Sequence, residues 1–115
     1  MIDIEELQLR LAEFAQEREW EQFHTPKNLA LALVGEVGEL CELLQWKSEG
    51  EVANALGDLQ FRNALADELA DVLIYLTRLS SVTGIDLADA VERKIQSNGE
   101  RYPVEDVRGS SEKRP

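Results

Sequence analysis

The fold is decided by the stretch PKNLALALVGEVGELCELLQW, residues 26–46. Leu29, Leu33, Leu40 and Leu43 recur here at helical spacing, so a helix places all four on one face. Apolar residues also occupy much of the remaining circumference, which is typical of a helix that is covered on more than one side. The stretch therefore predicts a long helix in the interior of the fold.

Caps and breakers predict three further helices, one before this stretch and two after it. The third helix along the chain carries a long apolar line: Leu65, Leu69, Val72, Leu76 and Leu79. The four start signals are Asp3 with Glu6 as a capping box, Thr25 followed by Pro26, the segment 58–63, and Asp86. The four ends are expected before Glu19, near Gln45, at Gly84 and at Gly99. Residues 47–57 form a linker with room for a short helix capped by Ser48 and Glu51.

No alternating apolar and polar run competes with these helices, so we expect an all-α fold. Four helices joined by short connections most simply form a four-helix bundle. The second and third helices are more apolar than one small bundle can cover, which favours a homo-oligomer, a homodimer or a homotetramer. The domain is expected to span residues 1–105, followed by a flexible tail at 106–115.

Length and charge restrict the class of protein further. The chain has 115 residues, enough for one domain, and a formal net charge of −11. So many negative charges disfavour binding to a nucleic acid polymer. Cys41 is the only cysteine, and no apolar run approaches the ~20 residues of a membrane span, so we expect a cytoplasmic protein without membrane association.

Two pairs of acidic residues interrupt the apolar faces. Glu36 and Glu39 are three residues apart on the second predicted helix, and Glu68 and Asp71 repeat that spacing on the third. Residues three apart leave a helix on the same side. Both pairs are therefore predicted to face the core.

These four acids have no basic residue nearby in the sequence to neutralise them. Neither 28–46 nor 63–77 contains Lys or Arg. Carboxylates in a partly dry interior repel one another and lose hydration unless something compensates for it. Mg²⁺ is the simplest compensation, with Mn²⁺ as an alternative, because both accept hard oxygen ligands.

The same residues resemble those of a known family. The segments GEVGEL (35–40), DELADVL (67–73) and Lys94-x-x-x-Asn98-x-x-Arg101-Tyr-Pro are similar to the signature of the MazG-like all-α nucleoside triphosphate pyrophosphohydrolases. The dCTP pyrophosphatase branch is most similar, because 17–29 and 44–47 also resemble its segments. The resemblance covers about residues 4–110.

The resemblance implies a hydrolase that cleaves a nucleoside triphosphate, dCTP or a modified dCTP, between the α and β phosphates. The products are the monophosphate and pyrophosphate, a house-cleaning reaction of the nucleotide pool. Glu36, Glu39, Glu68 and Asp71 would hold Mg²⁺, which neutralises the polyphosphate and makes hydroxide available near neutral pH. Either Glu36 or Glu39 would serve as the catalytic group that orients or deprotonates water.

Further residues are implied to bind the substrate. Trp20 and Trp46 match positions that line the base pocket, and each lies at the edge of a predicted helix, where an indole can stack on a base. The residues of the third motif would bind the triphosphate and metal. The complete set of substrate-binding candidates is Trp20, His24, Trp46, Lys47, Lys94, Asn98, Arg101 and Tyr102.

Two positions depart from the family pattern. Leu11 stands where dCTP-selective members often present a histidine, and a leucine side chain forms no hydrogen bond with a base. Asp67 stands where a glutamate is common. The departure at Leu11 leaves the preferred base open.

Two other interpretations remain open at this point. Glu21-x-x-His24 has the spacing of a carboxylate and histidine pair in di-iron bundles, although such sites need two pairs. Alternatively, the chain is a non-catalytic acidic helical module that binds a partner through apolar stripes.

Overall fold

The computed structural model describes all 115 residues, and every regular element in it is a helix. The elements are α1 Ile4–Glu17, a 3₁₀ turn η1 Glu21–Phe23, α2 Pro26–Glu42, α3 Glu49–Ala55, α4 Leu59–Thr83, α5 Leu87–Arg101 and α6 Val104–Val107. The all-α expectation is confirmed. None of these helices is both long and apolar enough to cross a membrane.

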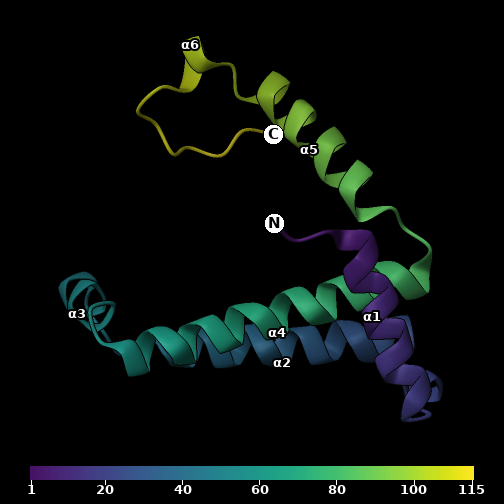
Figure 1. Cartoon of the computed structure of the whole chain (residues 1–115). Coiled ribbons are helices and arrows are strands. Elements are labelled where there is room, and N and C mark those ends of the chain that lie inside the picture. The colour runs from purple at the N-terminus through teal and green to yellow at the C-terminus, as the bar shows by residue number, and fades with distance from the viewer. The chain divides into compact units, whose positions relative to one another are not determined.

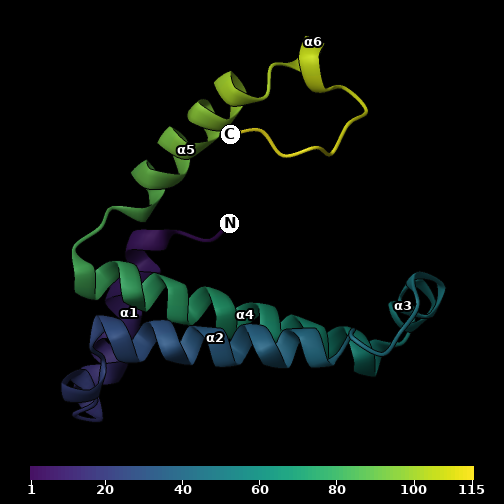
Figure 2. The ribbon, with the colours of Figure 1, turned by 180° about the vertical axis from the view of Figure 1, so that it is seen from behind.

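Two compact units divide the chain, and each is described by itself. In the unit Met1–Gly84, α2 and α4 run side by side, and α1 lies across them near the C-terminal end of α4 (Figures 1 and 2). In the unit Ile85–Pro115, α5 leads through α6 into a tail that returns to Tyr102, whose Oη accepts a hydrogen bond from the backbone N–H of Arg114 at 2.9 Å.

Side-chain caps start the helices where the sequence predicts them. Thr25 Oγ1 accepts from the backbone N–H of Asn28 at 3.1 Å, and the short helix α3 has the complete Ser48 and Glu51 capping box. The side chains of Asp3 and Asp86 accept from the backbone N–H groups of Glu6 and Asp89, and the return bond of the capping box predicted at Asp3 and Glu6 is not formed. Each cap satisfies a helical N–H that would otherwise lack a partner.

Two expectations about the ends of helices are wrong, and one helix was not expected. The second helix ends at Glu42, short of Gln45, because the next residues tighten into turns with hydrogen bonds from Leu44 and Gln45 to the carbonyl of Cys41. Gly99 lies inside α5, which continues to Arg101. The four-residue helix α6 was not expected at all.

The packed interior is small, and part of it is polar. Ala15 and Leu29 are the only apolar residues that are fully buried. On α4 the residues of the predicted apolar line are partly exposed to solvent, since Leu69 is 54% and Leu76 is 38% exposed. The buried residues of this helix are Thr77, Arg78 and Ser80, beside the crossing α1, where Gln8 Nε2 donates to Ser80 Oγ at 3.1 Å.

Candidate functional site

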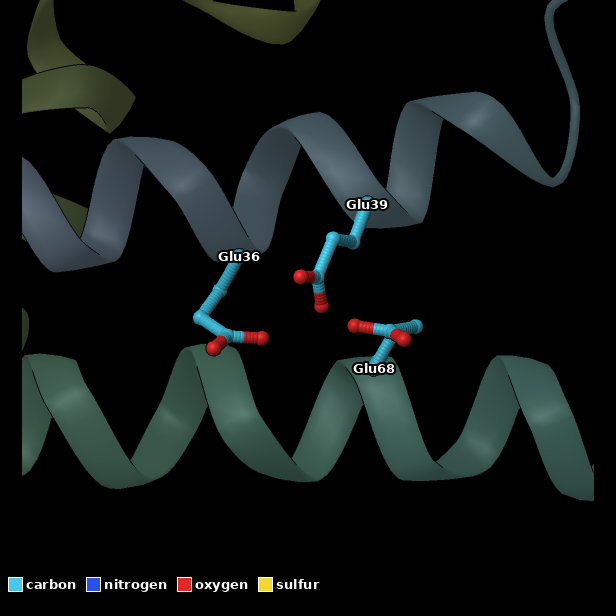
Figure 3. Close-up of side chains that lie close together, drawn as sticks. All are labelled: Glu36, Glu39 and Glu68. Carbon is cyan, nitrogen blue, oxygen red and sulfur yellow. The ribbon is translucent and has the colours of Figure 1, made fainter.

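Acidic side chains meet where α2 and α4 lie side by side. Glu36 and Glu39 come from α2 and Glu68 from α4, and the three carboxylates point toward one another across the gap between the helices (Figure 3). One oxygen from each of them lies within 4.8 Å of the others. Three of the four predicted metal ligands are thus gathered at one point.

Two of these acids are partly removed from water without any compensating protein group, whereas Glu39 is exposed. Glu36 and Glu68 are half-buried, and each has an Oε2 atom that is buried and accepts no hydrogen bond. The ion pairs of the chain join Arg18 to Glu17, Arg93 to Asp89 and Arg114 to Asp106, so none reaches this cluster. A buried oxygen without a donor is costly, and a bound cation would relieve that cost.

Burial and mutual repulsion of these carboxylates raise the pKa values of Glu36 and Glu68. Loss of hydration is the largest cause that raises the pKa of Glu36 from 4.5 to about 7, and the negative charge of Glu39 is the next. Burial and the charge of Glu39 also raise the pKa of Glu68. A cluster of this kind accepts either a proton or a metal ion.

Asp71, the fourth predicted ligand, lies one helical turn beyond Glu68. It is not one of the three residues whose oxygens converge, but its charge contributes to the raised pKa values of Glu36 and Glu68. It also lines the adjacent cavity. Asp71 therefore connects the acidic cluster to that cavity.

The cavity has a volume of about 310 Å³ and lies within the first unit. Its walls are mostly apolar and aromatic and come from α1, the residues on either side of η1, α2 and α4. The lining residues are Leu11, Phe14, Trp20, His24, Leu29, Asp71, Ile74, Tyr75 and Arg78. A concave, largely apolar space with a few polar groups is the usual form of a small-molecule site.

Two predicted substrate-binding residues, Trp20 and His24, meet in this cavity. The rings of Trp20 and His24 are 6.4 Å apart, and Trp20 also packs edge-on against Phe14 at 5.8 Å. His24 Nδ1 accepts a hydrogen bond from Arg78 Nε at 3.1 Å. Burial, followed by the charge of Arg78, lowers the pKa of His24 below 6.5.

Arg78 and Tyr75 also line the cavity and were not predicted from the sequence. Asp71, Tyr75 and Arg78 are spaced by four and three residues, which places them on one face of α4. That spacing was available in the sequence. A basic residue on the same helix face as Asp71 was the signal that could have found Arg78.

The other predicted substrate-binding residues are not among those that line this cavity. Trp46 follows the end of α2 and is 86% exposed, and the adjacent Lys47 has its Nζ 5.7 Å from the ring centroid of Phe61. The remaining four candidates belong to the second unit: Lys94, Asn98, Arg101 and Tyr102. Tyr102 is half-buried, and the other three are exposed.

Comparison with known proteins identifies the chain. The sequence profile of the MazG-like family matches residues 32–114, which include all four acidic residues. The chain belongs to the MazG-like family. The resemblance predicted from the motifs is confirmed, and the profile covers the acidic motifs but not Trp20 or His24, which precede it.

Similar proteins carry related names. This MazG-like chain is 53% identical over 108 residues to dCTP pyrophosphatase 1 of Rattus norvegicus, covering 94% of the chain and 64% of that protein. It is 52% identical over 110 residues to dCTP pyrophosphatase 1 of Homo sapiens, covering 96% of the chain and 65% of that protein. The chain thus spans just under two thirds of the length of these relatives.

A solved structure has the same fold. A pyrophosphatase from Archaeoglobus fulgidus is 41% identical and superimposes with a TM-score of 0.81, covering 90% of the MazG-like chain and 94% of that structure. A solved pyrophosphatase is therefore similar in fold over 90% of this chain.

Proposed function

We propose that this chain is a Mg²⁺-dependent nucleoside triphosphate pyrophosphohydrolase. It hydrolyses a deoxynucleoside triphosphate, dCTP or a modified dCTP, to the monophosphate and pyrophosphate, and so removes unwanted nucleotides from the cytoplasmic pool. The observation that carries the proposal is the convergence of Glu36, Glu39 and Glu68 beside an aromatic cavity. The names of the similar dCTP pyrophosphatases support it.

The acidic cluster has the chemistry of a Mg²⁺ or Mn²⁺ site. Its donors are all carboxylate oxygens, and the buried Oε2 atoms of Glu36 and Glu68 lack any protein partner. Asp71 completes the proposed ligand set. A bound divalent cation supplies positive charge that neutralises the triphosphate and lowers the pKa of water.

Side chains of this protein activate the attacking water, bind the base and bind the triphosphate. Either Glu36 or Glu39 orients the attacking water and accepts its proton. The Trp20 and His24 end of the cavity holds the base, with Trp46 and Lys47 contributing from beyond α2. The cationic and hydrogen-bonding side chains of the second unit bind the triphosphate: Lys94, Asn98, Arg101 and Tyr102.

We also propose that the chain completes a four-helix bundle and forms a homo-oligomer. Large apolar side chains are exposed to solvent on α2, α4 and α5. Among them, Leu31 is 61%, Leu69 is 54% and Ile95 is 60% exposed. Burial of such side chains against a second copy is favourable. Light scattering is expected to give a mass that is two or four times 13.0 kDa, and a monomer at micromolar concentration would contradict this assembly.

Product analysis tests the function. Triphosphates of cytosine, 5-methylcytosine, uracil, thymine and the purines are incubated with the protein in Mg²⁺ and in EDTA. We expect monophosphate and pyrophosphate in equal amounts, with Mg²⁺ only. Release of orthophosphate, or no turnover of any triphosphate, would contradict the proposal.

A non-catalytic interaction module is the second candidate function. The exposed apolar faces of α2 and α4 favour it, because they would equally bind a partner helix. The same assay separates the two functions, since an interaction module releases no pyrophosphate.

A further inference from the structure

Arg78 is a buried cation without an acidic partner. It is 8% exposed and forms no ion pair. Its one hydrogen bond runs from Nε to His24 Nδ1, so the two Nη atoms have no protein acceptor. Since Arg78 lines the cavity, those Nη donors are available to a ligand in it.

The contact with Arg78 determines the protonation of His24. A guanidinium only donates hydrogen bonds, so Nδ1 of His24 must be the acceptor, and the ring proton is on Nε2. The lowered pKa of His24 agrees with this neutral form. The pair therefore presents N–H donors to the cavity.

Position along α4 separates this pair from the acidic cluster. Arg78 is seven residues beyond Asp71, a rise of about 10 Å along the helix. The cavity thus has the Asp71 carboxylate at one position along α4 and the Arg78 donors at another, and its walls include aromatic side chains. A nucleotide whose phosphates lie toward the acids would bring its base toward Arg78.

Leu11 lines the same cavity and cannot form a hydrogen bond. Leu29 and Ile74 are likewise apolar. The polar groups that line the cavity are those of Trp20, His24, Asp71, Tyr75 and Arg78. Among them only the Arg78 guanidinium can offer two parallel N–H donors to one edge of a base.

We infer that Arg78, oriented by His24, determines base selectivity by donating to the adjacent acceptors N3 and O2 of cytosine. This inference rests on the proposed function and deepens it. Uracil and thymine carry a hydrogen on N3, which would face the guanidinium donors and leave them unsatisfied. Arg78 is thus a specificity-determining residue, and His24 is its positioning residue.

Steady-state kinetics of wild type and Arg78→Gln test the inference. Wild type is expected to prefer dCTP over dUTP in kcat/KM, and the variant to lose about 5- to 150-fold of that preference, the range for a bidentate arginine contact to a base. The loss should appear mainly in the KM for dCTP. Arg10→Gln, a control on the exposed side of α1, should keep the preference because Arg10 does not line this cavity.

The outcomes distinguish this inference from the proposed function. If no triphosphate yields pyrophosphate, the proposed function fails. If pyrophosphate is released but Arg78→Gln leaves the dCTP to dUTP ratio unchanged, the inference fails alone. Cleavage of dUTP by wild type as efficient as that of dCTP would also overturn it, because uracil has no acceptor at N3 for the second guanidinium donor.

Two variants of His24 test the same inference in case Arg78→Gln does not fold. Asn at this position retains an acceptor near that of Nδ1, whereas Phe retains a ring without an acceptor. We expect His24→Asn to keep the selectivity and His24→Phe to lose part of it, with thermal midpoints recorded for both. Titration of dCMP and dUMP, followed by tryptophan fluorescence, should give the same order without turnover, and equal selectivity in both variants would contradict the positioning role.

Discussion

Glu36 and Glu68 each bury a carboxylate oxygen that no group of the chain satisfies. Replacing either with the isosteric Gln removes the charge that a divalent cation needs, but keeps the shape. We expect pyrophosphate release to fall by more than roughly 100-fold, since even outer partners of metal ligands are worth 10–100-fold. Far-UV circular dichroism should be unchanged.

Glu42→Gln is the matched control for these variants. Glu42 is on α2 but is not among the three converging acids, and it is exposed. It should retain activity. Full activity in Glu36→Gln and Glu68→Gln would show that the site assignment is wrong.

The raised pKa of Glu36 also predicts how stability depends on pH. In EDTA the folded state keeps a proton on Glu36 up to about pH 7, whereas in the unfolded state the pKa is 4.5. The folded state therefore binds more protons in this window, and the free energy of unfolding falls as pH rises through it. The raised pKa of Glu68 acts in the same direction.

Thermal midpoints measured in EDTA between about pH 5 and about pH 7.5 check this prediction. Wild type should lose stability toward the upper value, and Glu36→Gln should lose less. His24 has a lowered pKa and opposes the trend, but it contributes equally to both proteins. Equal slopes for the two proteins would contradict the assignment of the raised pKa to Glu36.

At the scale of residues, the sequence predicted the acids better than the cavity. Charges on an apolar face stand out in a sequence, which is why Glu36, Glu39 and Glu68 were found. Arg78 was missed because its role depends on α1 and η1 covering the end of α4, and this contact joins segments 54 residues apart. Such long-range contacts leave no periodic signal.

At the scale of elements, Gly84 provides the clearest test of local structure. It ends α4 with φ of +69°, a left-handed conformation that is unfavourable for other residues. Gly84→Ala should lower the free energy of unfolding by about 1–2 kcal/mol.

Gly35→Ala is the opposite case, because Gly35 lies inside α2 with no atom within 4 Å of an added Cβ. It should raise stability by roughly 0.5–1 kcal/mol. Urea denaturation followed by circular dichroism measures both effects. A shift of the same sign in both variants would contradict the helix boundaries.

Helix starts could be predicted because caps are local. Asp3, Thr25 and Asp86 each accept a backbone N–H three residues ahead. Helix ends were predicted less well. Gly99 does not end α5, since a glycine inside a helix costs only about 1 kcal/mol, and the helix instead stops at Arg101, shortly before Pro103.

At the scale of the whole molecule, the net charge of −11 makes the folded chain sensitive to cations. Millimolar Mg²⁺ should raise the thermal midpoint by binding the folded state specifically. NaCl at the same ionic strength should raise it less, because it only screens charge. Calorimetry checks this, and equal effects of both salts would argue against a specific site.

The assembly of the chain could not be derived from periodicity alone. The apolar patterns of α2 and α4 indicate that these helices need cover, but the same pattern serves a helix of this chain or of another copy. In the single chain Leu31 and Leu69 are exposed, so no helix of the same chain covers them.

Binding of Mn²⁺, measured from the loss of the electron paramagnetic resonance signal of the free ion, tests the central claim most directly. Wild type and Glu42→Gln should bind Mn²⁺ without any nucleotide, and Glu36→Gln and Glu68→Gln should bind it far more weakly while remaining folded. Equal Mn²⁺ binding by all four proteins would contradict a metal site between α2 and α4.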